Sequence, residues 1–147
     1  MLFSASSQEE RDNHYGNSKK EARKTIQEWA SSNNATFTGM IIPNVFGPFG
    51  KPFYNSVVAT FSHLVATGGA PKIEVDGDLK LIYVNELVAE IISKINSKEN
   101  NPSYNVPHTS EAKVSEILAL LNHYKSLYQD NGEVPEISNS FELNLFN

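Results

Sequence analysis

A tyrosine and a lysine stand four residues apart in this sequence, as Tyr15 and Lys19 of the segment YGNSK. On a helix this spacing places both side chains on one face, with about 6 Å of rise between them. A free tyrosine hydroxyl has a pKa near 10, so it is a poor proton donor or acceptor at neutral pH unless a cation stabilises its phenolate. Lys19 is placed to do this, and the pair therefore predicts acid/base chemistry at the start of a helix.

Three serines, Ser4, Ser6 and Ser7, precede this pair at the end of a short apolar stretch. A serine hydroxyl at that place would hold a substrate carbonyl or hydroxyl beside the tyrosine. The spacing does not choose among the three serines. A Tyr-x-x-x-Lys spacing arises about 0.4 times by chance in a chain of this composition, so the prediction depends on the surrounding elements.

Helices are predicted wherever apolar residues recur at three- and four-residue spacings. The predicted helices cover 15–33, 53–67, 85–95 and 114–128. In the first of them, only Lys19 of the charged residues shares the face of Tyr15. The others, Lys20, Arg23 and Lys24, are predicted to form a solvated face.

Strands are predicted in short runs of β-branched and apolar residues. These runs are 2–5, 36–42, 72–75 and 79–84, the last two joined as a hairpin by the turn residues Asp76-Gly77-Asp78. Residues 96–107 are predicted as a linker, and residues 130–147 show only a weak pattern. Strands that alternate with helices predict an α/β fold with a parallel sheet.

Composition excludes several classes of function. The 12 Lys and Arg against 17 Asp and Glu give a net charge of −5, so no nucleic-acid partner is expected. Zero cysteines exclude disulfides and thiolate zinc sites, and the four histidines lack ligand spacing, so no metal is expected. The absence of a signal peptide and of a long apolar run predicts no membrane partner and a cytoplasmic protein.

The order of these features resembles the extended short-chain dehydrogenase/reductase superfamily, the NAD-dependent epimerase/dehydratase family. The resemblance is carried by the serines before YGNSK, by PNVFGP at 43–48 and by LIYVNELVA at 81–89. The segment YNSVVATF at 54–61 further resembles the capsular-polysaccharide nucleotide-sugar reductases and epimerases of the CapF/WbjC type.

This resemblance implies roles for residues around the first helix. Tyr15 would be the acid/base residue, Lys19 its pKa-lowering partner and a contact to the cofactor ribose, and Ser6 the hydroxyl that orients the substrate. Tyr15, Lys19 and Pro43 would contact the cofactor. That cofactor would be NAD or NADP, with NADPH favoured by the family.

The resemblance also implies residues that bind a nucleotide-sugar substrate. Asn44 would line the pocket, and Lys51 and Asn55 would contact the diphosphate or the sugar. Lys80 would supply a point charge near a position where an arginine is common in the family.

The implied fold is the C-terminal part of a Rossmann-like doubly wound parallel sheet with the substrate-binding region. Residues 1–96 would form the catalytic-helix part, and residues 97–147 a linker, a helix and a polar end. Because a glycine-rich turn does not precede Tyr15, the chain is expected to be a fragment that lacks most of the cofactor site and is inactive alone.

The implied function is part of an NAD(P)-dependent reductase or epimerase acting on a UDP-linked keto-deoxy-aminohexose in capsular or O-antigen polysaccharide synthesis. A homodimer is a further expectation from the family. Two alternatives stay open. One is a non-catalytic remnant that binds a sugar nucleotide or a protein, and the other is a deoxysugar 4-keto reductase or 4-epimerase.

Overall fold

A computed structural model describes residues 1–10 and 12–147, residue 10 by its backbone alone. The chain divides into two compact units, each built from two separate stretches. Unit 1 comprises Met1–Pro43 and Asn85–Pro107, and unit 2 comprises Asn44–Val84 and His108–Asn147. The expected boundary at 96/97 falls inside the second stretch of unit 1, within a helix.

Unit 1 contains a parallel sheet of three strands. Its order is β1 (Leu2–Ser6), β2 (Thr38–Ile42) and β5 (Asn101–Asn105). The predicted strands at 2–5 and 36–42 are confirmed, and their parallel register pairs Ser6 with Ile42, so both strands end at the same edge.

The strand β5 lies where a linker was predicted. Its sequence NPSYN is polar, and backbone pairing with β2 places it in the sheet. At its ends, the Asn101 amide donates to the Phe37 carbonyl at 2.9 Å and the Val106 amide to the Ile41 carbonyl at 3.0 Å. These partners are far away in the sequence, so no local pattern predicts the strand.

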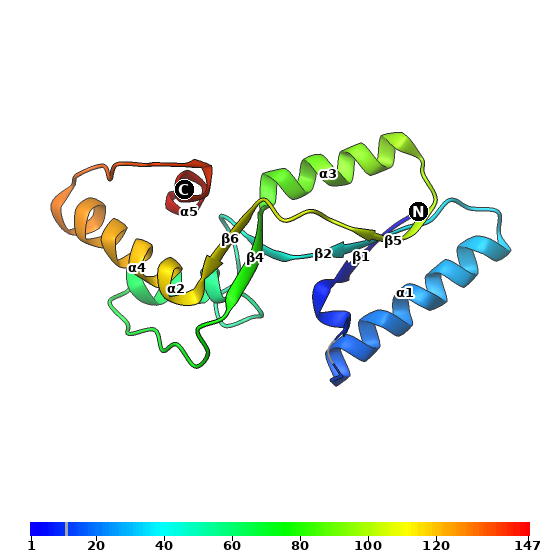
Figure 1. Ribbon diagram of the computed structural model, residues 1–147, viewed down its shortest axis with the longest axis horizontal. Helices are drawn as coiled ribbons and strands as arrows, with labels where there is room; N and C mark the ends of the chain where they lie inside the picture. Colours follow the sequence, from blue (N-terminus) through cyan, green and yellow to red (C-terminus); the bar gives the residue numbers. More distant parts are fainter. Residues whose placement is uncertain (11) are drawn as a thin grey trace. The chain divides into compact units, whose positions relative to one another are not determined.

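Two helices cover the sheet of unit 1. They are α1 (His14–Ser32) and α3 (Val84–Ser97), and they lie on opposite faces of the strands (Figure 1). Asn13 caps α1, because its side chain accepts a hydrogen bond from the Gly16 amide at 2.8 Å. Both helices agree with the predicted ones within a few residues, as expected for amphipathic segments with clear periodicity.

Unit 2 contains a second, mixed sheet. The strand β3 (Asn44–Phe46) runs parallel to β4 (Asp78–Tyr83), which pairs antiparallel with β6 (Ser110–Lys113). The predicted hairpin is therefore wrong, since residues 72–75 form no strand. Val75 is 78% exposed, whereas β6 brings the buried Ala112 to the core. Burial of Ala112, rather than proximity in sequence, favours β6 as the partner of β4.

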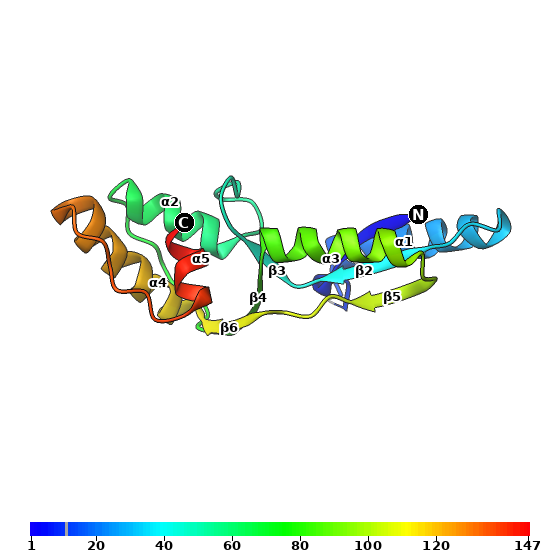
Figure 2. The ribbon, with the colours of Figure 1, turned by 90° about the horizontal axis from the view of Figure 1, so that it is seen from above.

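Three helices complete unit 2. They are α2 (Val57–Ala66), α4 (Val114–Tyr124), which continues into a π-helical turn at Lys125–Asp130, and α5 (Ser140–Phe146) (Figures 1 and 2). The last helix was not predicted, yet its Leu145 belongs to the hydrophobic core. The other large side chains of this core include Phe46, Phe61, Leu81, Ile117 and Leu121. None of the helices in the described part of the chain is long and apolar enough to cross a membrane.

Candidate functional site

Ser6 is the last residue of β1, and a 3-10 turn (Ser7–Glu10) follows it directly. The Ser6 Oγ accepts a hydrogen bond from the Gln8 amide at 3.2 Å, which leaves its own proton available to a ligand oxygen. The side chain lies at the carboxyl ends of parallel strands, the edge at which open α/β sheets bind ligands. Local geometry therefore holds this hydroxyl at the carboxyl edge of the sheet.

Tyr15 lies in the first turn of α1 with 40% of its surface exposed, and Lys19 follows one turn later. The Lys19 Nζ is 5.8 Å from the centroid of the Tyr15 ring. The two side chains thus share one helix face, and the ammonium group lies beside the phenol. This arrangement can transfer a proton to a ligand oxygen and stabilise the charge left on the phenol.

Arg23 belongs to the same helix face and is not solvated, contrary to the prediction from the charged run. Its side chain is 16% exposed and forms a salt bridge of 2.8 Å with Glu9, whose side chain is 5% exposed. The sequence gives only a weak signal for this burial, because a charged residue four positions after Lys19 is equally typical of a solvent-exposed position. A tertiary partner in the turn after β1 buries it.

Pro43 follows β2 directly and is half-buried. Since Ser6 and Ile42 are paired in register, Pro43 lies at the same strand edge as the turn that follows Ser6. Ser6 and Pro43 thus lie at this edge, and Tyr15 and Lys19 lie in the first turns of α1, the helix that follows the turn after β1. The donors of Tyr15 and Lys19 fit the ribose of a dinucleotide cofactor, because a phenol and an ammonium group can both donate hydrogen bonds to ribose hydroxyls.

The predicted substrate residues all belong to unit 2. Asn44 begins β3, and its Nδ2 donates to the Lys80 carbonyl at 3.1 Å, so the amide fastens β3 to β4. Lys80 has an exposed side chain and stands opposite Glu111 of β6 in the antiparallel register. The structure brings Asn44 and Lys80 together directly, and part of the role of Asn44 is to hold the sheet.

Lys51 and Asn55 lie in the loop between β3 and α2, where the predicted helix start at 53 is wrong. Phe53 and Asn55 have positive φ values of 59° and 50°, and Ser56 caps α2 instead. The Lys51 Nζ is 5.5 Å from the ring of Tyr54. Left-handed residues other than glycine are strained and concentrate at ligand-binding loops.

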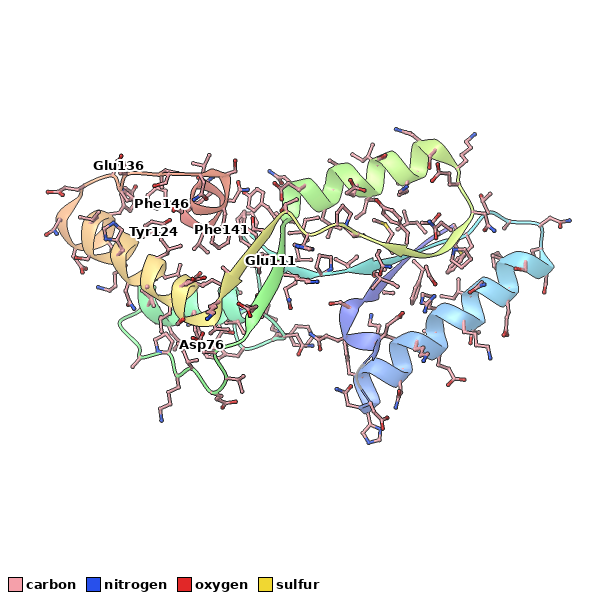
Figure 3. The ribbon with its side chains drawn as sticks, in the orientation of Figure 1. Asp76, Glu111, Tyr124, Glu136, Phe141 and Phe146 are labelled. Atoms are coloured by element: carbon pink, nitrogen blue, oxygen red, sulfur yellow. The ribbon has the colours of Figure 1, made fainter. Side chains whose placement is uncertain are left out.

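A cavity of about 410 Å³ lies within unit 2 and was not predicted. The Tyr124 ring stands 5.4 Å from that of Phe146, and its hydroxyl donates to the Glu142 carbonyl at 3.4 Å (Figure 3). Burial, and then the Glu142 carboxylate, raise the pKa of Tyr124. The four-residue spacing of Phe141 and Leu145 is the sequence feature that indicates an apolar helix face in the C-terminal segment. The cavity is also lined by Phe46, Phe49, Pro52, His63 and Tyr128.

Metal-ligating side chains do not gather in the part of the chain that the structure describes. No group of three or more His, Asp or Glu there is arranged to hold an ion. His108 instead contacts Glu111 through its Nε2 at 2.8 Å.

Comparison with known proteins gives a consistent result. The model of the NAD dependent epimerase/dehydratase family matches residues 4–106. A UDP-2-acetamido-2,6-beta-L-arabino-hexul-4-ose reductase of Pseudomonas aeruginosa is 29% identical over 128 residues, 86% of this chain and 34% of the reductase. The chain therefore spans about a third of that relative.

Solved structures of nucleotide-sugar enzymes and of CapF share the fold of this chain. The capsular polysaccharide assembling protein CapF of Staphylococcus aureus superposes with a TM-score of 0.83 at 33% identity, over 99% of this chain and 41% of CapF. A UDP-N-acetylglucosamine 4-epimerase of Methanobrevibacter ruminantium has a TM-score of 0.78 at 19% identity, over 99% and 60% of the two chains, a likeness of fold alone. The parallel sheet with helices on its faces is thus the Rossmann-like arrangement expected.

Proposed function

Because this chain belongs to the NAD-dependent epimerase/dehydratase family, we propose that it forms the catalytic-helix and nucleotide-sugar side of an NAD(P)-dependent reductase. Its substrate would be a UDP-linked keto-deoxy-aminohexose of capsular or O-antigen polysaccharide synthesis. The observation that carries the proposal is the Tyr15 and Lys19 pair on one face of α1, 5.8 Å apart from ring to ammonium. The identities of 29% and 33% to a UDP-sugar reductase and to CapF support it.

The proposed chemistry assigns one proton and one hydride to the reduced carbonyl. Tyr15, Lys19 and Pro43 would hold a nicotinamide cofactor, NADPH by family preference, which would supply the hydride when bound. Tyr15 donates its phenolic proton to the carbonyl oxygen as that oxygen gains charge. Lys19 stabilises the phenolate that remains, and Ser6 donates a hydrogen bond that orients the same oxygen.

The substrate side of the proposal rests on unit 2. Lys51, above the Tyr54 ring, would attract the diphosphate, and Asn55 would bind the sugar or the diphosphate from the same loop. Lys80 would contribute a second positive charge, and the amide oxygen of Asn44 would line the pocket while its nitrogen holds β4. A hydride transfer assay on the full gene product tests the whole proposal.

The first prediction concerns Tyr15→Phe in that gene product. We expect turnover of the UDP-linked keto sugar to fall by about 10²–10⁴, because the proton donor is lost, while NADPH affinity falls by no more than about tenfold, the effect of one neutral hydrogen bond. Oxidation of NADPH and cofactor binding by titration measure the two quantities. Trp29→Phe, which alters an exposed aromatic residue of α1 outside the proposed site, is the control and should retain wild-type turnover.

The same assay separates the alternatives. Full turnover in the Tyr15→Phe enzyme would remove Tyr15 from its role. Interconversion of 4-epimers without net NADPH consumption would identify a 4-epimerase. Binding of the nucleotide sugar without any conversion would indicate a binding module.

A further inference from the structure

Arg23 holds Glu9 through a fork of two contacts. Its Nη2 lies 2.8 Å from Glu9 Oε1, and its Nε donates to Glu9 Oε2 at 3.2 Å. Both side chains are largely buried, at 16% and 5% exposure. A two-point arrangement of this kind fixes orientation as well as distance, which a lysine cannot reproduce.

The same guanidinium also reaches β5. Its Nη1 donates to the Pro102 carbonyl at 2.9 Å and to the Ser103 Oγ at 2.7 Å. The stem of Arg23 crosses β2 at Gly39, where an added Cβ would lie 2.9 Å from Arg23 Cδ and 2.5 Å from the Pro102 oxygen. A glycine at this position of β2 is therefore needed for Arg23 to pass between α1 and the sheet.

The fork connects two segments of unit 1, the end of β1 that carries Ser6 and the helix α1 that carries Tyr15 and Lys19. Tyr15, Lys19 and Arg23 follow one another at four-residue intervals, so they share one face of α1. Glu9 lies three residues after Ser6, in the turn that leaves β1. The ion pair thus closes the chain between residues 9 and 23, across the segment that begins the catalytic helix.

We propose that Arg23 and Glu9 are positioning residues that fix the Ser6-bearing strand end relative to Tyr15 and Lys19. We call this ion pair the Arg23–Glu9 clamp, and its effect on catalysis rests on the proposed function. Net stability alone is a weak reason for such a pair, since burying two charges costs desolvation that their attraction often only offsets. Orientation is a stronger reason, because a misplacement of about 1 Å at reacting groups can lower a rate by about 10²-fold.

Arg23→Lys tests the clamp, because it keeps the charge and removes the fork. In the full gene product we expect kcat to fall about 10- to 100-fold while KM for the nucleotide sugar stays within about twofold. Lys24→Met removes an exposed charge from the same helix, and its kcat should equal that of the wild type.

Amide hydrogen exchange gives a readout independent of activity. The Gln8 and Gly16 amides, bonded to Ser6 and Asn13, should exchange about tenfold faster in Arg23→Lys. The Ala35 amide, bonded to the Ala30 carbonyl at the far end of α1, should keep its wild-type rate. Faster exchange at all three amides would mean a general loss of stability and would overturn the proposal.

An unchanged kcat in a folded Arg23→Lys enzyme would overturn it as well. Failure of the proposed function has a different signature, the absence of turnover in the wild-type gene product. In that case the amide exchange pattern of Arg23→Lys alone tests whether the ion pair positions Ser6 relative to Tyr15. Acceleration confined to Gln8 and Gly16 supports the clamp, and unchanged exchange there contradicts it.

Discussion

At the residue scale, Asp76 shows how an exposed carboxylate becomes part of the fold of unit 2. Its two oxygens accept hydrogen bonds from the Ser115 amide and the Ser115 Oγ, both at 2.8 Å, at the start of α4 (Figure 3). The backbone hydrogen bond first, and the hydroxyl hydrogen bond second, lower the pKa of Asp76 from its ordinary value of 3.8. The carboxylate thus supplies an N-terminal cap from a distant loop.

Asp76→Asn should make unit 2 less sensitive to acid. The folded-state pKa lies below the unfolded one, so the ionised group stabilises the fold above about pH 4, and this contribution is lost as the pH falls through the folded pKa. Urea unfolding at a series of pH values should give a shallower loss of stability toward low pH in the variant. Equal slopes in the two proteins would contradict the cap.

Glu136→Gln is the control for this experiment. It removes an exposed carboxylate from the segment before α5, which Figure 3 labels. The acid dependence of this variant should follow that of the wild type.

At the scale of elements, two leucine substitutions in α5 test whether the C-terminal segment packs in the core of unit 2. Leu145 is 8% exposed and belongs to the core of unit 2, whereas Leu143 in the same helix is 48% exposed. Leu145→Ala should lower the free energy of unfolding by about 2–5 kcal/mol, because it leaves a cavity. Leu143→Ala should change it by about 0.5 kcal/mol or less.

Urea unfolding of the two leucine variants measures this difference. Equal and small effects would mean that α5 does not pack in the core. The comparison is matched, since both substitutions remove the same atoms from one seven-residue helix.

Elements with strong local signals were predicted well, and short polar strands were not. The helix that carries Tyr15 follows from its apolar periodicity and from Asn13 at its start. The strands β5 and β6 are polar and depend on backbone pairing with β2 and β4. The predicted hairpin is wrong because a turn signal at Asp76-Gly77-Asp78 does not show whether residues 72–75 are buried. Val75 is exposed, and β4 pairs with β6 instead.

At the scale of the whole molecule, the proposed nucleotide-sugar site predicts stabilisation by UDP. A ligand at 100 times its Kd adds about 2.7 kcal/mol to the stability of a protein that binds it only when folded. UDP should therefore raise the melting temperature of the full gene product. Lys51→Met should reduce this rise, since a cation for the diphosphate is lost.

Lys72→Met is the matched control, because Lys72 is exposed and lies outside the loop at 47–55. Thermal unfolding with and without UDP measures the effect. An equal rise in the Lys51 and Lys72 variants would exclude Lys51 from the site, and no rise in the wild type would contradict UDP as a ligand.

The sequence alone predicts the α/β class with a parallel sheet and the placement of Tyr15 and Lys19 on one helix face. These follow from periodicity and from i, i+4 geometry, which act over a few residues. The burial of Arg23, the pairing of β4 with β6 and the packing of α5 depend instead on tertiary contacts. Arg23 meets Ser103 across 80 positions of sequence, and local patterns do not encode partners at that separation.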